Sequence, residues 1–181
     1  MIFHETFLEG AFVIEIQKIN DNRGFFGRSW CKNEMEKRGL NGNVVQTNTS
    51  FSSKKGTLRG MHYQKHPYEE TKLIRCTKGA IYDVIIDLRK GSPTYLHWFG
   101  IELTADNYKM LYVPEKFAHG FITLKDNTEV TYQVTQFYTP GAESGIRFND
   151  PRLKINWPVP VTMISEKDKA HPNFNEILIL E

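Results

Sequence analysis

Cysteine and long hydrophobic runs are both scarce in this sequence, and each absence excludes a class of protein. The 181 residues contain two cysteines, Cys31 and Cys76, which lie far apart and lack the spacing of a metal site. We therefore expect no disulfide framework and a reducing compartment, by default the cytoplasm. No segment approaches the roughly 20 apolar residues that a membrane helix needs, and the N-terminus has no signal-peptide pattern. No membrane partner is expected.

An excess of charge of one sign is also lacking. The 23 Lys and Arg residues are nearly balanced by 21 Asp and Glu residues, which gives a net charge of +2. A general nucleic-acid surface would need a basic face, so nucleic acid is not an expected partner, although a local cluster of arginines can still bind a small anion. The length predicts one domain, residues 1–181.

What the sequence does contain is a series of short strands separated by turn residues. The predicted strands are Phe12–Ile16, a short strand ending at Trp30, Val44–Phe51, Gly56–Gln64, Thr71–Cys76, Ile81–Leu88, Tyr95–Leu103, Lys109–Val113 and Thr128–Thr135. On Ile81–Leu88 the even-numbered residues form the expected apolar side. One helix is expected at Asn33–Arg38, with Asn33 as its N-cap and Gly39 beyond its end. This pattern indicates an all-β sandwich or barrel.

The stretch Gly56–Gln64 carries a guanidinium, an imidazole and a phenol within nine positions. Successive side chains of a strand point to opposite faces, so alternation places His62 with Gln64 and turns Arg59 the other way. If Arg59 and His62 serve one pocket, the strand must bulge or twist at Gly60 between them.

Three polar side chains fall on the predicted inner faces of three different strands, namely His62, Lys72 and Tyr132. A buried polar group costs free energy unless it is hydrogen-bonded. A base, a cation and a weak acid are also what proton transfer next to a carbonyl group requires. From the residues alone, a hydrogen-bonded core network and an active site both remain open.

A metal site is an alternative function for these residues, because small β barrels often hold a metal ion. The spacing of Gly56, His62 and Glu69 fits the first metal motif of cupin-type jelly rolls. However, Gln64 stands where the second histidine ligand belongs, and Lys116 replaces the glycine that precedes His119 in the second motif. With one of three histidine ligands absent, we expect no metal and no cofactor.

Motifs along nearly the whole chain resemble one family. They are Asp21–Phe26, Gln46–Ser50, Gly56–Gln64, Lys72–Arg75, Asp83–Val84, Asp87–Thr94, Pro114–Phe121, Tyr132, Asn149–Pro151, Trp157–Pro158 and Ser165–Asp168. The sequence resembles the dTDP-4-dehydrorhamnose 3,5-epimerase family, the metal-independent cupin sugar epimerases of deoxysugar biosynthesis.

The resemblance implies a cupin-type double-stranded jelly roll with short helices, and a homodimer in which N-terminal strands cross to the partner subunit. It implies His62 as the base, oriented by Asp168, with Tyr132 as the acid and Lys72 as the group that stabilises the enolate. The residues implied for binding the sugar, the diphosphate or the nucleotide are Arg23, Phe26, Arg28, Gln46, Asn48, Arg59, His119, Tyr138, Glu143 and Lys167.

One departure from the family concerns the nucleotide end of the site, where most members have a glutamate and this sequence has Arg28. The expected function is epimerisation at carbons 3 and/or 5 of a nucleoside-diphosphate 4-keto-6-deoxyhexose, with dTDP as the expected nucleotide, in deoxysugar biosynthesis. The alternatives are a single-carbon epimerase, a 3,4-ketoisomerase, or a non-catalytic cupin that binds nucleotide sugars. Binding alone would need neither a base nor an opposed acid, which favours an enzyme.

Overall fold

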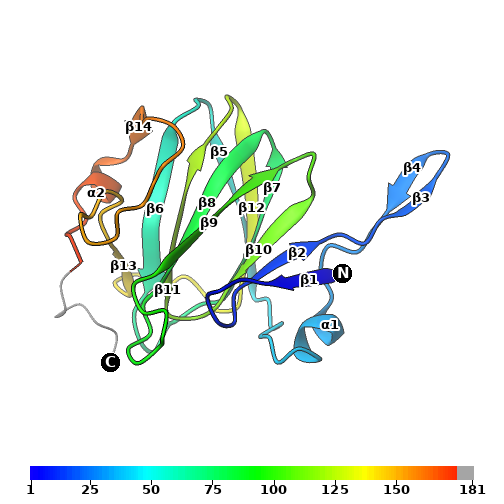
Figure 1. Cartoon of the computed structure of the whole chain (residues 1–181), viewed down its shortest axis with the longest axis horizontal. Helices are drawn as coiled ribbons and strands as arrows, with labels where there is room; N and C mark the ends of the chain where they lie inside the picture. Colours follow the sequence, from blue (N-terminus) through cyan, green and yellow to red (C-terminus); the bar gives the residue numbers. More distant parts are fainter. Residues whose placement is uncertain (175–181) are drawn as a thin grey trace.

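The computed structural model describes residues 1–174, in which two sheets face each other (Figure 1). The first sheet has the order β1 (Ile2–Glu5), β2 (Phe12–Glu15), β10 (Lys109–Val113), β7 (Lys72–Lys78), β12 (Thr128–Val134) and β5 (Gln46–Ser52). The second has the order β13 (Glu143–Gly145), β6 (Thr57–Gln64), β11 (Phe117–Thr123), β8 (Ala80–Asp87) and β9 (Trp98–Thr104). A short strand β14 (Met163–Ile164) pairs in parallel with β6, whereas the other pairs are antiparallel. The predicted all-β jelly roll is confirmed.

The main core fills the space between the two sheets. Ile74 and Cys76 of β7 and Val130 of β12 meet Ile85 of β8 and Phe121 of β11 there. Alternate residues of these strands supply this layer, as expected for a pleated strand with one face inward.

Both cysteines are free thiols. Burial raises the pKa of Cys76 to about 11, so Cys76 acts as a small buried hydrophobe.

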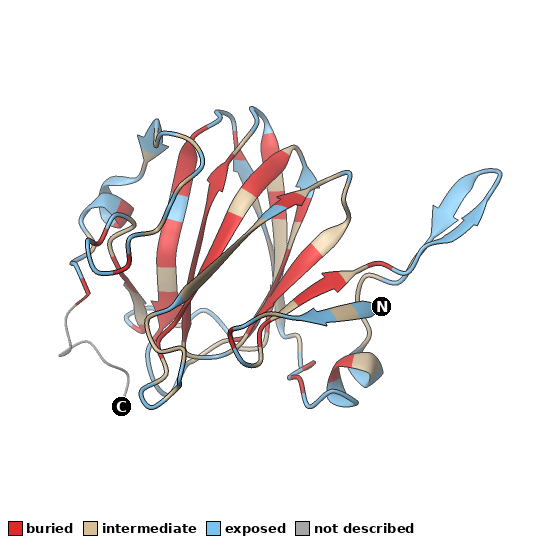
Figure 2. Cartoon of the chain, in the orientation of Figure 1, coloured by how far each residue is buried: buried red, intermediate tan, exposed pale blue. Residues whose placement is uncertain are grey.

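The outer faces of both sheets are also covered, and Figure 2 shows most residues of central strands such as β8 as buried. A cluster including Met35 and Leu40 packs against Ile14 and Met110 on the outside of the first sheet. Residues of the C-terminal segment, from Ile146 to Phe174, cover the outside of the second. Strand β8 is therefore buried on both faces, and the prediction of a single apolar side was incomplete.

The two helices differ from expectation. Helix α1 (Lys32–Glu36) begins after Cys31, with no side-chain cap, so the prediction of Asn33 as the N-cap was wrong. Gly39 does follow the helix, with a φ of 70°. A second helix, α2 (Glu166–Lys169), was not predicted. It is capped by Ser165, whose side chain accepts a hydrogen bond from the Asp168 N–H. Among residues 1–174, no helix is long and apolar enough to cross a membrane.

A two-stranded arm, β3 (Ile19–Asp21) and β4 (Gly24–Phe26), projects from the body of the molecule (Figure 1). All six of its strand residues are exposed (Figure 2). The short strand that was expected to end at Trp30 ends at Phe26 instead, where the chain leaves the hairpin. Within residues 1–174 the two strands of the arm pair only with each other, and Phe25 packs edge-on against Tyr108, next to β10, at 4.9 Å between ring centroids.

Candidate active site

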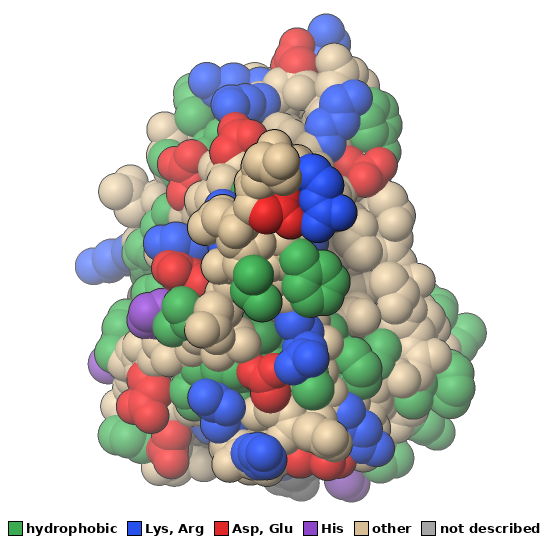
Figure 3. Space-filling view, turned by 90° about the vertical axis from the view of Figure 1, so that its right-hand side faces the viewer, with side chains coloured by type: hydrophobic (Ala, Val, Ile, Leu, Met, Phe, Trp, Pro, Cys, Tyr) green, Lys and Arg blue, Asp and Glu red, His purple; other side chains and the backbone are tan. Residues whose placement is uncertain are grey.

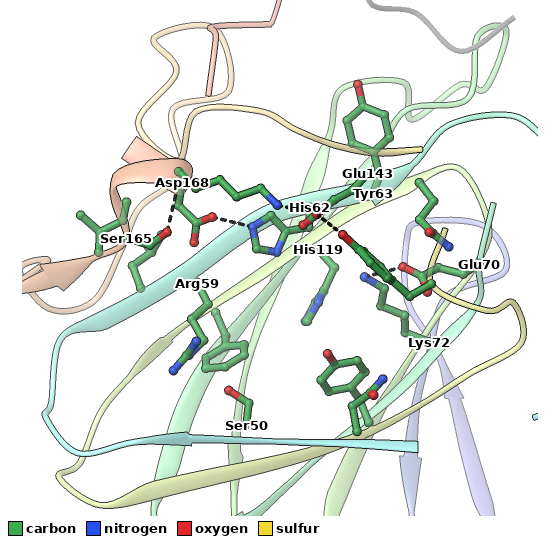
Figure 4. Close-up of a pocket in the computed structure, with 18 of the residues that line it drawn as sticks. Ser50, Arg59, His62, Tyr63, Glu70, Lys72, His119, Glu143, Ser165 and Asp168 are labelled. Atoms are coloured by element: carbon green, nitrogen blue, oxygen red, sulfur yellow. Dashed lines mark hydrogen bonds and ion pairs between the residues drawn. The ribbon is translucent and has the colours of Figure 1, made fainter. Parts of the chain in front are cut away.

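A cavity of about 940 Å³ opens between the sheets. Its walls come from β5, β6, β7, β11 and β12, together with the segments that contain β13 and α2 (Figure 4). The structure brings most of the predicted site residues together in this one cavity. Those that line it are Gln46, Asn48, Arg59, His62, Lys72, His119, Tyr132, Tyr138, Glu143, Lys167 and Asp168.

A bulge in β6 turns Arg59 and His62 into the same cavity. His62 pairs with His119 of β11 and Arg59 pairs with Phe121, so β6 has one more residue between these pairs than β11 has. Gly60 takes a φ of 131°, and a Cβ on it would lie 2.5 Å from the Gly120 Cα. Only glycine fits such a conformation at such a close approach. The predicted irregularity at Gly60 is confirmed.

His62 and Asp168 form a tight pair. His62 Nε2 lies 2.7 Å from Asp168 Oδ1 (Figure 4). The Gly60 N–H donates to Asp168 Oδ2 at 3.2 Å. Only 5% of Asp168 is exposed. Burial alone would raise the pKa of Asp168, but the hydrogen bond and charge of His62 and the Gly60 N–H outweigh it and lower that pKa. Asp168 is thus a stable carboxylate that holds one nitrogen of His62.

A second buried imidazole–carboxylate pair lies beside the first. His119 Nε2 is 2.7 Å from Oδ1 of Asp83, a residue with no exposed surface. Because His119 pairs with His62 across the strands, the two imidazoles are neighbours on one wall. Asp83 was not among the predicted site residues.

The opposite wall belongs to the first sheet and carries Tyr132 and Lys72. Lys72 Nζ forms an ion pair with Glu70 Oε1 at 3.0 Å, with both side chains largely buried (Figure 4). Burial raises the pKa of the Tyr132 phenol, and the charge of Glu70 raises it further, against the smaller opposing effect of Arg59. Tyr132 is therefore held as a protonated phenol. Glu70, which lines the cavity, was also not predicted.

Polar groups at the mouth are already linked to one another. Lys167 and Tyr138 both donate to the Glu143 carboxylate. Burial acts to raise the pKa of Glu143, but Lys167 and the nearby His62 lower it overall. On β5, which belongs to the first sheet, the Gln46 amide donates to the Asn48 side chain at 2.9 Å. A polar ligand that enters the cavity can replace these hydrogen bonds between side chains with hydrogen bonds to itself.

Arg59 and Gln64 contact the backbone of neighbouring segments. Arg59 donates to the Ser52 hydroxyl and to the Phe51 carbonyl. The Gln64 amide donates to the carbonyls of Tyr68 and Phe137 and accepts from the Thr139 N–H. Gln64 therefore fixes the chain around Tyr138, and does not take the part of a ligand. The absence of a metal cofactor stays a prediction.

Three predicted residues lie outside this cavity. Arg23 pairs with Asp21 at the tip of the arm, at 2.6 Å, and Arg28 pairs with Glu34 at 2.8 Å. Phe26 is 73% exposed. None of the three lines the cavity of its own chain.

A third imidazole, that of His171, was missed. It lies behind the His62–Asp168 pair, with Nε2 3.7 Å from Asp168 Oδ1 and its ring edge-on to that of His62. Burial lowers the pKa of His171, and the charges of His62 and Lys167 lower it further, against the effect of Asp168. His171 lies outside any strand, so alternation gave no signal for it.

The cavity thus presents a base with its carboxylate on one wall and a phenol with an ammonium on the other. A family model described as dTDP-4-dehydrorhamnose 3,5-epimerase matches residues 5–176. The chain belongs to this family.

Relatives of known name support the assignment. A dTDP-4-dehydrorhamnose 3,5-epimerase of Salmonella typhimurium is 39% identical over 183 residues and covers 100% of both chains. A crystal structure of the Bacillus anthracis enzyme with TDP and PPi bound is 45% identical, with a TM-score of 0.92 over 96% of this chain and 99% of that one. ChmJ, a 3'-monoepimerase from Streptomyces bikiniensis in complex with dTDP-quinovose, is 30% identical. Its TM-score is 0.86, over 94% of this chain and 86% of the ChmJ chain.

Proposed function

We propose that this epimerase inverts carbons 3 and 5 of a dTDP-4-keto-6-deoxyhexose without a metal or cofactor, in dTDP-rhamnose biosynthesis. The observation that carries the proposal is the placement of His62 and Tyr132 in one cavity on opposite sheets. Inversion at carbon requires a proton to leave one face and another to arrive at the opposite face, so two groups on opposed walls are needed.

His62 is the base. A carboxylate can only accept, so Asp168 requires the proton of neutral His62 to be on Nε2, and Nδ1 keeps the lone pair. Carbons 3 and 5 both flank the keto group at carbon 4. Transfer of a proton from either carbon to Nδ1 breaks the C–H bond, and its electron pair moves into an enolate whose charge lies on the carbon-4 oxygen. Asp168 stabilises the imidazolium that forms.

Lys72 stabilises the enolate oxygen. An ammonium has three donors, and the ion pair with Glu70 uses one of them, so the others remain for the substrate. Tyr132 then delivers its proton to the face opposite His62, and the enolate electrons return to form the new C–H bond. The raised pKa of Tyr132 keeps this acid protonated at neutral pH.

The rest of the cavity binds the nucleotide sugar. Arg59 offers paired N–H donors suited to phosphate oxygens, and His119, oriented by Asp83, contacts the sugar or the diphosphate. Gln46 and Asn48 bind sugar hydroxyls, and Tyr138 at the mouth stacks on the base. Glu143 and Lys167 exchange their mutual contact for the substrate.

The active unit is a homodimer of single-domain subunits in which the arm reaches the cavity of the partner. The arm exposes Ile19 and Phe26, and the side of the molecule that carries it shows hydrophobic side chains among mixed charges (Figure 3). In the dimer, Arg23, Phe26 and Arg28 meet the nucleotide. Sedimentation of the intact chain and of a variant lacking residues 19–26 tests this, because loss of the arm should weaken association and raise KM together.

Inversion of one carbon only is the second candidate, favoured by the likeness to ChmJ, a monoepimerase. The higher identity to the Bacillus anthracis enzyme supports inversion of both carbons.

We also place the enzyme in the cytoplasm, since both cysteines are free thiols.

NMR in D₂O with a panel of nucleoside-diphosphate 4-keto sugars tests the function. Deuterium at carbons 3 and 5 with inverted products is expected for the dTDP sugar. Exchange at one carbon alone would assign a monoepimerase. Binding without exchange on any sugar would assign a non-catalytic binder, and movement of the keto group would assign a ketoisomerase.

A further inference from the structure

The His62–Asp168 pair has a third member that the proposed chemistry does not use. His62 Nε2 and His171 Nε2 both approach the same carboxylate oxygen, at 2.7 and 3.7 Å. One ligand atom from each of the three residues lies within 4.8 Å of the others. Two imidazole nitrogens and a carboxylate oxygen are a common ligand set for Zn²⁺ and related transition-metal ions, and an unsuitable one for Mg²⁺ or Ca²⁺.

The buried nitrogen of His171 is left unsatisfied. Its Nε2 is inaccessible to solvent and has no hydrogen-bond partner among the described residues. Buried polar atoms in native proteins are nearly always paired, so this atom needs an explanation. A metal ion between His171 and Asp168 would supply the missing partner.

The surrounding backbone holds the His171 ring in place. A Cβ on Gly145 would lie 2.3 Å from Nε2 of His171, so the ring rests directly on the backbone of β13. The Arg147 side chain donates to the His171 carbonyl at 3.0 Å, and the Arg147 N–H donates to the Pro172 carbonyl at 2.9 Å. The nitrogen is therefore fixed by contacts that do not use it.

We propose that His62, Asp168 and His171 bind a divalent transition-metal ion such as Zn²⁺, and that the bound ion inhibits the enzyme. Zn–N and Zn–O bonds of about 2.0–2.1 Å place neighbouring ligand atoms about 3.3 Å apart in a tetrahedral site. The two observed separations bracket that value, so each needs to change by about half an ångström. An ion can enter from the cavity, because His62 and Asp168 both line it.

Inhibition follows from what the ion displaces, and this part rests on the proposed function. Metal bound at Nε2 of His62 replaces the hydrogen bond to Asp168 and places positive charge on the ring. The ring then accepts a proton at Nδ1 less readily, since two positive charges would share one imidazole. The metal thereby removes the base from use.

Zinc binding to chelator-treated protein, measured by calorimetry, tests the site. The wild type should bind one ion per chain. Both His171→Ala and His171→Asn should weaken binding by at least about tenfold, since loss of mere outer-sphere partners costs that much at metal sites. His66→Ala is the matched control, because His66 has a carboxylate partner, Glu69 at 3.1 Å, but no second imidazole. It should bind zinc as the wild type does.

X-ray absorption of the zinc-loaded wild type does not depend on whether a variant folds correctly. Scattering from two imidazoles is expected. Lack of saturable binding, a spectrum without imidazole, or His171 variants that bind as tightly as wild type would overturn the site. One zinc per chain in a protein inactive on every 4-keto sugar would support the site and count against the proposed function.

The inhibition is tested on the epimerase reaction itself, with each variant compared with its own metal-free rate. Zinc should slow deuterium uptake by the wild type, a chelator should restore it, and both His171 variants should resist zinc. Tight binding without loss of rate would overturn the inhibitory role. Activity lost on chelation and restored by stoichiometric metal would make the ion a cofactor, and would also overturn the inhibitory role.

Discussion

The two walls of the cavity hold their reactive groups in different ways. On the wall of the second sheet, His62 is bound to Asp168 at 2.7 Å, and Asp168 is held in turn by the Gly60 N–H and by its place in α2. On the wall of the first sheet, the Tyr132 hydroxyl has no hydrogen bond from residues 1–174, and its environment acts on it through burial and charge alone. In the proposed reaction, the base is therefore held in position before substrate binds, whereas the acid finds its hydrogen-bond partner in the substrate.

Removal of the base should have the largest effect. His62→Ala should lose both inversion and deuterium uptake, because no enolate forms without a base, and a positioned base is typically worth about 10²–10⁴-fold. NMR in D₂O measures both in one sample. A His62→Ala enzyme that still inverts its substrate at close to the wild-type rate would show that the base lies elsewhere.

Removal of the acid should separate the two readouts. In Tyr132→Phe, His62 can still take the proton and return a deuteron to the same face. Deuterium should enter the sugar, while inversion falls by about 10²-fold or more. If exchange is blocked as completely as in His62→Ala, although substrate still binds, then Tyr132 does more than protonate the opposite face.

The wall residues were predictable because alternation within a strand is strict. Lys72 follows the parity of Ile74 and Cys76, and Tyr132 that of Val130, and each points inward as predicted. The bulge followed from the need to bring Arg59 and His62 together with a glycine between them. The residues that point outward from a strand, by contrast, do not reveal whether a further layer of the protein covers that face of the sheet.

The missed residues each lacked a local signal of this kind. Asp83 lies on the face of β8 opposite to the one taken as apolar, so it became visible only once both faces proved buried. Glu70 precedes β7, although it shares the parity of Lys72. His171 comes from an irregular segment whose place depends on contacts with Arg147 and Gly145, which are distant in sequence.

Arg28 belongs to a third region, separate from the two walls. It lies outside the cavity of its own chain and pairs with Glu34. In the proposed dimer it meets the nucleotide, far from the reacting carbons. Arg28→Glu should therefore change the ratio of kcat/KM between nucleoside diphosphates by about two- to fivefold, the range of an exposed charge, and leave kcat unchanged.

The repulsion that Arg28→Glu creates with Glu34 needs its own control. Arg28→Gln removes the charge without that repulsion, and Glu34→Gln removes the pair while keeping Arg28. Nucleotide preference should change in both Arg28 variants and stay in Glu34→Gln. Loss of kcat with every nucleotide at unchanged KM would instead place Arg28 in the chemistry.

The smallest expected effect concerns Glu70, whose charge acts on Tyr132 and Lys72 in the wall of the first sheet. Burial and Glu70 both raise the pKa of Tyr132, and the acid works only while it is protonated. Inversion is therefore present at lower pH and is lost as pH rises through the pKa of Tyr132. Glu70→Gln removes a negative charge and frees the positive charge of Lys72, and both changes lower that pKa. The alkaline limit of inversion should move to lower pH, by less than about one unit.

Exchange and inversion measured together across pH make this shift specific to Tyr132. Above the alkaline limit, His62 still takes and returns protons on its own face, so the ratio of deuterium uptake to inversion should rise, and should rise at lower pH in Glu70→Gln. Glu69→Gln is the matched control, since Glu69 pairs with His66 and does not line the cavity. Its profile should follow the wild type. An alkaline limit in Glu70→Gln that stays in place or moves upward would mean that Glu70 does not act on Tyr132, and that the two walls are tuned by other charges.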